Sequence, residues 1–196
     1  MKIFITREIP EAGILLLKKK GFEVSVYKKD KPISKNELIK TVKNCDGLIS
    51  LLTDKIDKEV IDSMKNCKVI ANYAVGFNNI DVEYAKIKGI IGTNTPDVLT
   101  DSTADLAIAL VLACARRIPE SEKLIRSRKF VGWKPKLLLG MELRNKYFGI
   151  LGAGRIGTEV AKRAHAFSCR IIYYSNSANS FLENKLDAEK LSLRSI

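Results

Sequence analysis

The chain has 196 residues, of which 46% are hydrophobic, and a formal net charge of +12. This length and composition predict a globular protein with one large domain or two small ones. The lysines are spread along the chain and do not form the concentrated basic stripe of a nucleic-acid-binding protein, so we expect no nucleic-acid partner.

Membrane, secreted and metal-binding classes also fit poorly. The longest uncharged apolar run, residues 106–115, is too short to span a bilayer. The N-terminal "MKIFIT" is typical of a strand and lacks the apolar core of a secretory signal, so we expect a cytoplasmic protein without a membrane partner. The cysteines are widely spaced and there is a single histidine, which predicts reduced thiols and neither a zinc site nor a disulfide framework.

Five short β-branched runs alternate with helix-like segments in the first half of the chain. The predicted strands are 2–6, 22–27, 47–52, 68–74 and 90–94. Ser34 with Glu37 forms a capping box, and Asp57 precedes an amphipathic segment, so helices are expected at both places. This alternation predicts a doubly wound α/β domain with a parallel sheet.

The pattern changes after Pro96. The residues from Thr100 to Ser102 are expected to cap a long helix, "TADLAIALVLACARR", which is apolar on nearly every side and should therefore be buried. A polar helix after Pro119 and a loop exposing Trp133 are expected next. We place the domain boundary near Leu99, which gives domains of residues 1–98 and 99–196.

The stretch "GILGAGRIG", residues 149–157, carries three glycines at GxGxxG spacing. Strand-like runs at 146–151 and 170–174 flank a helical pattern, which predicts a βαβ unit. In that setting Gly152 permits the tight turn, Gly154 lets the backbone approach a pyrophosphate, and Gly157 allows close packing of helix on strand. The alternative is a glycine-rich turn that binds no ligand.

The residue that normally binds the cofactor ribose in this motif is acidic and ends the next strand. Here Ser175 occupies that position and Asn176 follows. Without a carboxylate there is no repulsion toward a 2'-phosphate, and both side chains can donate hydrogen bonds to it. The sequence therefore permits NAD or NADP and slightly favours NADP.

Several motifs together resemble the D-isomer-specific 2-hydroxyacid dehydrogenases, in particular the glyoxylate and hydroxypyruvate reductase branch. They are "GLISLLTDKID", "ANYAVGFNNID", "GTNTPDVLTDSTADLAIALVLACARRIPE", "GWKPKLLLG" and "GILGAGRIGTEVAKRAHAF", and they span essentially the whole chain. The resemblance implies a flavodoxin-like substrate domain, then the first part of a Rossmann NAD(P)-binding domain, in a homodimer. Asn78 and Ala153 depart from the aspartate and leucine usual in the family.

The resemblance also implies site residues. Val75 and Gly76 match the turn whose backbone amides hold the substrate carboxylate, although a plain glycine turn is the alternative. Thr103 matches a threonine near the nicotinamide, where helix capping is the alternative. Trp133 matches a tryptophan that reaches the partner subunit's active site, or is an ordinary buried aromatic. The remaining implied cofactor contacts lie in the glycine loop: Gly152, Ala153, Gly154, Arg155, Ile156 and Gly157.

Hydride reduction of a 2-keto acid needs a cation to bind the carboxylate and an acid to deliver a proton. In the family these are an arginine and a glutamate-paired histidine, all in a later part of the cofactor domain. His165 follows the glycine loop on a helix and is not expected to act as an acid. We therefore expect the truncated N-terminal part of an NAD(P)-dependent reductase of glyoxylate or hydroxypyruvate, without catalytic residues or turnover of its own.

Two alternatives remain open from the sequence. Within the same class, the substrate is that of a phosphoglycerate, formate or other 2-hydroxyacid dehydrogenase, although few basic residues surround the "YAVG" turn to bind a phosphate. In a different class, the chain is a non-catalytic NAD(P)-binding or interaction module that resembles the related corepressors.

Overall fold

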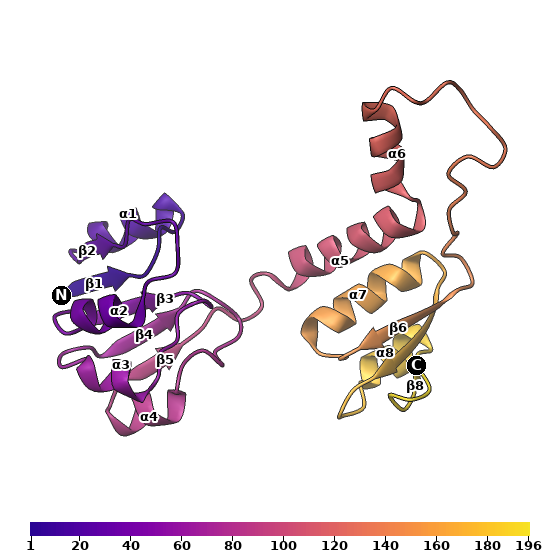
Figure 1. The fold of residues 1–196 in the computed structure, drawn as a ribbon. Helices are drawn as coiled ribbons and strands as arrows, with labels where there is room; N and C mark the ends of the chain where they lie inside the picture. Colours follow the sequence, from indigo (N-terminus) through magenta and orange to yellow (C-terminus); the bar gives the residue numbers. More distant parts are fainter. The chain divides into compact units, whose positions relative to one another are not determined.

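The protein is described by a computed structural model of all 196 residues, in which the chain forms two compact units. Unit 1 is Met1–Asp97 and unit 2 is Val98–Ile196. Each has its own parallel sheet and its own hydrophobic core (Figure 1). None of the helices combines the length and the apolar character needed to cross a bilayer.

Unit 1 contains a five-stranded parallel sheet in the order β2-β1-β3-β4-β5. The expected parallel α/β architecture is thus confirmed. All five expected strands form, each one to three residues shorter than the sequence predicted. Their bounds are β1 Lys2–Ile5, β2 Glu23–Val26, β3 Gly47–Ser50, β4 Val69–Asn72 and β5 Ile91–Thr93.

The four helices of unit 1 are α1 Glu11–Lys19, α2 Lys35–Val42, α3 Lys58–Ser63 and α4 Val82–Ile87. Two of them, α2 and α3, begin where the sequence placed their caps. The Ser34 side chain accepts a hydrogen bond from the Glu37 backbone N–H, and the Asp57 side chain accepts one from the Val60 N–H. Each cap satisfies an N–H that has no acceptor within its helix, which fixes where the helix starts.

The core of unit 1 lies between the sheet and the row formed by α2, α3 and α4 (Figure 1). Phe4, Leu48 and Ile70, from three adjacent strands, are buried there. The α1 helix is less well packed, because none of its residues is buried and Leu15 and Leu16 are more than half exposed.

Unit 2 begins with two helices and then builds a three-stranded parallel sheet in the order β6-β7-β8. The third strand, β8, has only two residues and lies just before Leu191. The helix α8 was missed; Asn179 caps it by accepting a hydrogen bond from the Leu182 N–H. The elements are α5 Thr100–Ala115, α6 Ile118–Arg126, β6 Tyr147–Leu151, α7 Arg155–Ala166, β7 Arg170–Tyr174, α8 Ser180–Leu186 and β8 Glu189–Lys190.

Two expectations about α5 were wrong. Thr100 to Ser102 do not cap it: the N-cap is Leu99, and Ser102 lies in the first turn, where its hydroxyl donates to the Leu99 carbonyl. The helix is also not buried on all sides. Ala104 and Ile108 are buried in the core that α5 shares with α7, but Leu106 and Leu110 are more than half exposed.

The strand β6 pairs only with β7, so its other edge is free. Tyr147 and Leu151 are about two-thirds exposed, at 65% and 66%. Gly149 and Leu151 line an open groove together with Ala107 and Val111 of α5. Apolar surface of this βαβ unit is therefore exposed along the free edge of β6.

The capping box of α2 predicts an acid-sensitive contact. The Glu37 carboxylate accepts hydrogen bonds from Lys29, Ser34 and Tyr27, with Lys29 the largest influence, and they lower its pKa to about 2 from the ordinary 4.5. Stability from this ionised form is complete above pH 4.5 and is lost as the pH falls through about 2. In urea unfolding across this range, Glu37→Gln should flatten the acid side of the stability curve.

The control is Glu23→Gln in β2, which removes an exposed carboxylate without an ion pair. Equal flattening by both substitutions would show that Glu37 has no special contribution.

Candidate substrate and cofactor sites

The first candidate site is the turn that follows β4, residues 73–79. The carbonyl oxygens of three consecutive residues in this turn accept hydrogen bonds from other residues of unit 1. The Ala74 oxygen accepts from the Thr95 N–H at 2.9 Å, the Val75 oxygen from Asn94 Nδ2 at 2.7 Å, and the Gly76 oxygen from Asn72 Nδ2 at 2.7 Å. These three consecutive carbonyl groups are therefore all bonded within the protein.

Asn72 is the buried centre of this arrangement, with only 2% of its surface exposed. Its second Nδ2 bond goes to Asn79 Oδ1 at 3.0 Å, and its Oδ1 accepts from Ser50 Oγ at 3.0 Å. Asn79 Nδ2 in turn donates to the carbonyls of Leu51 and Asp54. The network joins the ends of β3 and β4, so the turn is held at the carboxyl edge of the sheet.

Two adjacent N–H groups of the same turn are not used. Those of Val75 and Gly76 donate to no other group in the chain, and Gly76 is exposed. A Cβ added at Gly76 would meet only ordinary contacts, Asn78 Oδ1 at 3.5 Å and Leu52 Cδ2 at 4.0 Å. Adjacent free N–H groups in a turn form a concavity that binds an anion, so the turn has the chemistry of a carboxylate site.

The second candidate site is the glycine loop between β6 and α7. Gly152 has φ +97°, a conformation that side chains disfavour, and its N–H donates to the Tyr174 carbonyl. A Cβ at Gly157 would lie 2.1 Å from the Gly152 oxygen, so α7 packs against the turn only because residue 157 is glycine. A Cβ at Gly154 would meet nothing within 4 Å, which leaves open space above the loop.

The charge around the start of α7 also favours an anion. Each of the other seven helices has an Asp or Glu in its first turn, whereas α7 has none. An acidic side chain in the first turn normally offsets the positive end of the helix dipole. In α7 the first turn follows Gly154 directly and carries no acidic side chain, so the positive end of the helix dipole is not offset there and favours a phosphate.

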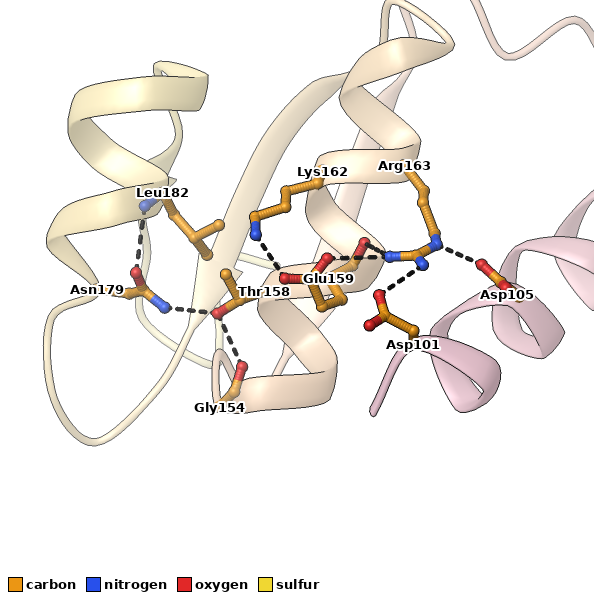
Figure 2. Close-up of polar contacts among 9 residues, drawn as sticks. All are labelled: Asp101, Asp105, Gly154, Thr158, Glu159, Lys162, Arg163, Asn179 and Leu182. Atoms are coloured by element: carbon orange, nitrogen blue, oxygen red, sulfur yellow. Dashed lines mark hydrogen bonds and ion pairs between the residues drawn. The ribbon is translucent and has the colours of Figure 1, made fainter. Parts of the chain in front are cut away.

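Two side chains hold the carbonyl groups of the glycine loop (Figure 2). Asn179 Nδ2 donates to the Ala153 oxygen and to Thr158 Oγ1, both at 2.9 Å. Thr158 Oγ1 then donates to the Gly154 oxygen at 2.8 Å. The loop is thus fixed from the segment after β7, with its carbonyls turned to the protein.

The helix that carries the loop is tied to α5 by Arg163 (Figure 2). Its guanidinium contacts Asp101 at 2.9 Å, Asp105 at 2.6 Å and Glu159 at 3.1 Å. The hydrogen bonds that Arg163 donates to Asp101, the largest influence, and to Asp105 raise the pKa of Arg163 above its ordinary value. The ion pairs join α5 and α7, so they fix the helix whose first turn forms the loop.

The remaining candidate residues of unit 2 lie around this loop and along α5. The register Leu151↔Tyr174 places Ser175 beside Gly152, and the exposed Asn176 follows it. Thr103 is half-buried in the first turn of α5, two helical turns (about 12 Å) from Val111, which lines the groove with Gly152.

The structure also places the four other implied residues and His165. Arg155 begins α7 and is exposed, Ile156 is half-buried behind it, and Ala153 is buried. Trp133 lies in the loop after α6 and is 81% exposed, so its interpretation as an ordinary buried aromatic was wrong. His165 is exposed at the opposite end of α7 from the glycine loop.

Sequence reasoning missed the asparagines that hold both turns: Asn72, Asn79, Asn94 and Asn179. Each lies at or shortly after the carboxyl end of a strand or opens a helix, positions where an asparagine often bonds to backbone. That signal was present in "IANYAVG" and "GTNTP", but it does not indicate which carbonyl each side chain reaches.

Residues 3–188 match the family model for the catalytic domain of D-isomer specific 2-hydroxyacid dehydrogenases. The chain belongs to this family. The match includes both candidate sites, so family membership applies to the turn after β4 and to the glycine loop alike.

Individual relatives agree with the family model. The chain is 48% identical to a glyoxylate reductase from Pyrococcus horikoshii over 192 residues, and 47% identical to one from Thermococcus kodakarensis over 199 residues. These alignments cover 96% and 100% of the chain but only 57% and 60% of the two enzymes. The chain therefore spans a little over half the length of these relatives.

Two solved structures share the fold. The TT0316 protein from Thermus thermophilus is 42% identical with a TM-score of 0.93, covering 100% of this chain and 61% of that one. D-lactate dehydrogenase from Aquifex aeolicus, solved with NAD and lactic acid, is 25% identical with a TM-score of 0.82, covering 100% and 57%.

Two alanine substitutions in the glycine loop should separate its effect on stability from its effect on NADH binding. Gly157→Ala forces a methyl group into the Gly152 carbonyl and should destabilise unit 2 by about 2 kcal/mol or more. Gly154→Ala points into open space and should change the free energy of unfolding by less than about 0.5 kcal/mol, while weakening NADH binding by crowding the diphosphate. Urea unfolding and a fluorescence titration of NADH measure the two quantities.

Gly132→Ala in the exposed loop after α6 is the control for a glycine replacement away from the site; its positive φ allows a modest loss of stability but no loss of NADH affinity. If Gly154→Ala binds NADH as the unchanged chain does, no diphosphate lies over Gly154.

Proposed function

We propose that this chain provides the substrate-binding unit and the first part of the dinucleotide-binding unit of an NAD(P)-dependent oxidoreductase of D-2-hydroxy acids. Glyoxylate or hydroxypyruvate is the proposed substrate. The observation that carries the proposal is the unused N–H groups of Val75 and Gly76 in unit 1, together with the acid-free first turn of α7 in unit 2. The names of the similar glyoxylate reductases support the choice of substrate.

In unit 1, the Val75 and Gly76 amides would bind the carboxylate of a small 2-keto acid. A carboxylate oxygen accepts strongly from backbone N–H groups, and the turn brings no acidic side chain of its own. Leu52, which is exposed and within 4.0 Å of a Gly76 Cβ position, would face the remainder of the substrate. The exposed Trp133 of unit 2 is proposed, from the family resemblance, to reach the same site in a partner subunit.

In unit 2, the residues present fit a dinucleotide. The open space at Gly154 and the first turn of α7 would receive the diphosphate, Gly152 to Gly157 would line it, and Thr103 would lie toward the nicotinamide end. When bound, the nicotinamide supplies the hydride for reduction of the keto group. The loop's own contribution is to bind and orient: its carbonyls are tied down by Asn179 and Thr158, so its donors need no rearrangement when the anion arrives.

The end of β7 favours NADP slightly over NAD. Ser175 and Asn176 offer hydrogen-bond donors and no carboxylate where an acid would select the free ribose hydroxyl of NAD. The D-lactate dehydrogenase solved with NAD is a reason to test both cofactors.

Ser175→Asp tests this preference. A carboxylate beside Gly152 should repel the 2'-phosphate and weaken NADPH binding about tenfold or more, while NADH binding stays equal or improves. Ser177→Asp adds the same charge at an exposed residue two positions later and should have a smaller effect. An unchanged NADPH to NADH ratio in Ser175→Asp would place the ribose elsewhere.

We propose that acid–base catalysis requires residues that neither candidate site of this chain contains. Its single histidine lies at the far end of α7, and neither turn holds a side chain suited to donate a proton to a keto oxygen. We therefore expect no oxidation of NADPH or NADH when the purified 196-residue chain is mixed with glyoxylate or hydroxypyruvate. Cofactor-dependent turnover, followed at the nicotinamide absorbance band, would contradict this.

The homodimer and the non-catalytic alternative also have observable consequences. Apolar side chains stay exposed on α5, α6 and the loop after them, and we propose that they pack against a second copy. They include Leu106, Leu110, Ile118, Ile125, Val131, Trp133 and Leu139.

Tight binding of one dinucleotide without turnover would instead favour the non-catalytic alternative, a binding module.

A further inference from the structure

We infer that Asn72 and Asn94 are positioning residues that present the Val75 and Gly76 N–H groups to an anion. The inference rests on the proposed function, because it concerns how the proposed carboxylate site is built. Neither asparagine touches the carboxylate in this arrangement. Each acts on the opposite side of the turn, through a carbonyl oxygen.

The geometry of a peptide explains why a carbonyl contact orients an N–H. The peptide unit is planar, and its C=O and N–H point in nearly opposite directions. The Val75 carbonyl belongs to the same peptide plane as the Gly76 N–H, so the 2.7 Å bond from Asn94 Nδ2 to the Val75 oxygen directs that N–H away from the sheet. The Thr95 N–H bond to the Ala74 oxygen does the same for the Val75 N–H.

Asn72 orients the next peptide unit in the same way. Its 2.7 Å bond to the Gly76 oxygen fixes the peptide that follows, so residue 76 is held from both sides. Glycine is the residue with most backbone freedom, and without these bonds the turn would populate other conformations. The two asparagines therefore remove at Gly76 the freedom that binding an anion would otherwise have to restrict.

The Asn72 side chain is itself held rigidly. Both of its Nδ2 hydrogens have acceptors, Gly76 O and Asn79 Oδ1, and its Oδ1 accepts from Ser50 Oγ. A buried amide with all of its donors satisfied has one favourable orientation. Rotation by 180° would place Oδ1 against the Gly76 oxygen, acceptor against acceptor, so the side chain cannot turn without losing these bonds.

Binding of oxamate to the 15N-labelled 196-residue chain, followed by NMR, tests the inference. Oxamate is a stable keto-acid analogue, and NMR measures weak binding residue by residue. In the unchanged chain the Val75 and Gly76 amide signals should shift and saturate. Asn94→Ala and Asn72→Ala should each raise the oxamate Kd about tenfold, the effect expected from losing one oriented hydrogen bond.

The pattern of shifts without ligand identifies the mechanism. Asn94→Ala should alter mainly the Gly76 amide signal, and Asn72→Ala mainly the Phe77 amide signal, because these N–H groups share a peptide plane with the released carbonyls. Asn78→Ala, an exposed asparagine of the same turn with no side-chain hydrogen bond, is the matched control and should leave the Kd unchanged. Asn94 is only half-buried, so Asn94→Ala keeps the test possible if Asn72→Ala fails to fold.

The outcomes separate the inference from the proposed function. If the unchanged chain shows no saturable shift at Val75 and Gly76, the proposed carboxylate site is wrong and the inference falls with it. If oxamate binds but the Asn94 and Asn72 variants bind it equally well, the inference alone is overturned. A lower urea midpoint with an unchanged Kd would mean that the asparagines only stabilise the fold, and this also overturns it.

Discussion

Buried backbone groups must find hydrogen-bond partners. Both candidate sites depend on which partners the protein itself supplies: it bonds carbonyl oxygens of each turn, but not every N–H group. In unit 1 the oxygens of three consecutive residues accept bonds from Thr95, Asn94 and Asn72. In unit 2 the glycine-loop oxygens accept bonds from Asn179 and Thr158. The protein thus satisfies these carbonyl groups of each turn. In unit 1 it leaves the Val75 and Gly76 N–H groups to be satisfied by water or by an anion.

The two units reach this result with different backbones. Unit 1 uses a turn at a strand end, where side chains from neighbouring strands do the holding. Unit 2 adds the first turn of a helix, so its donors are reinforced by the aligned peptide dipoles of α7. The diphosphate proposed for unit 2 carries more charge than the single carboxylate proposed for unit 1. The helix dipole lies at the site proposed for the more highly charged group.

Much of the fold could be predicted because its signals are local. The alternation of β-branched runs and helical segments predicted all five strands of unit 1, and Ser34 and Asp57 indicated where helices start, since a cap bonds within three residues. The packing role of Gly157 also followed from motif spacing. A failure concerned packing at longer range: the composition of α5 predicted a buried helix, whereas Leu106 and Leu110 are more than half exposed.

The asparagine contacts were beyond prediction for the same reason. Asn94 reaches a carbonyl 19 residues away, and Asn179 reaches one 26 residues away. Such pairs form only after parallel strands bring their carboxyl ends to one edge of a sheet. Residue type indicated that these side chains bond to backbone, whereas the partner was decided by strand order.

The contact between Gly157 and the Gly152 oxygen restricts how this nucleotide site can diversify. Any side chain at position 157 would separate the helix from the strand, and the positive φ of residue 152 disfavours side chains there. Changes that retune ligand preference without unfolding unit 2 are thereby confined to residue 154 and to the segment after β7. In this chain, cofactor preference can therefore change at a few positions around the loop while the helix–strand junction keeps its two glycines.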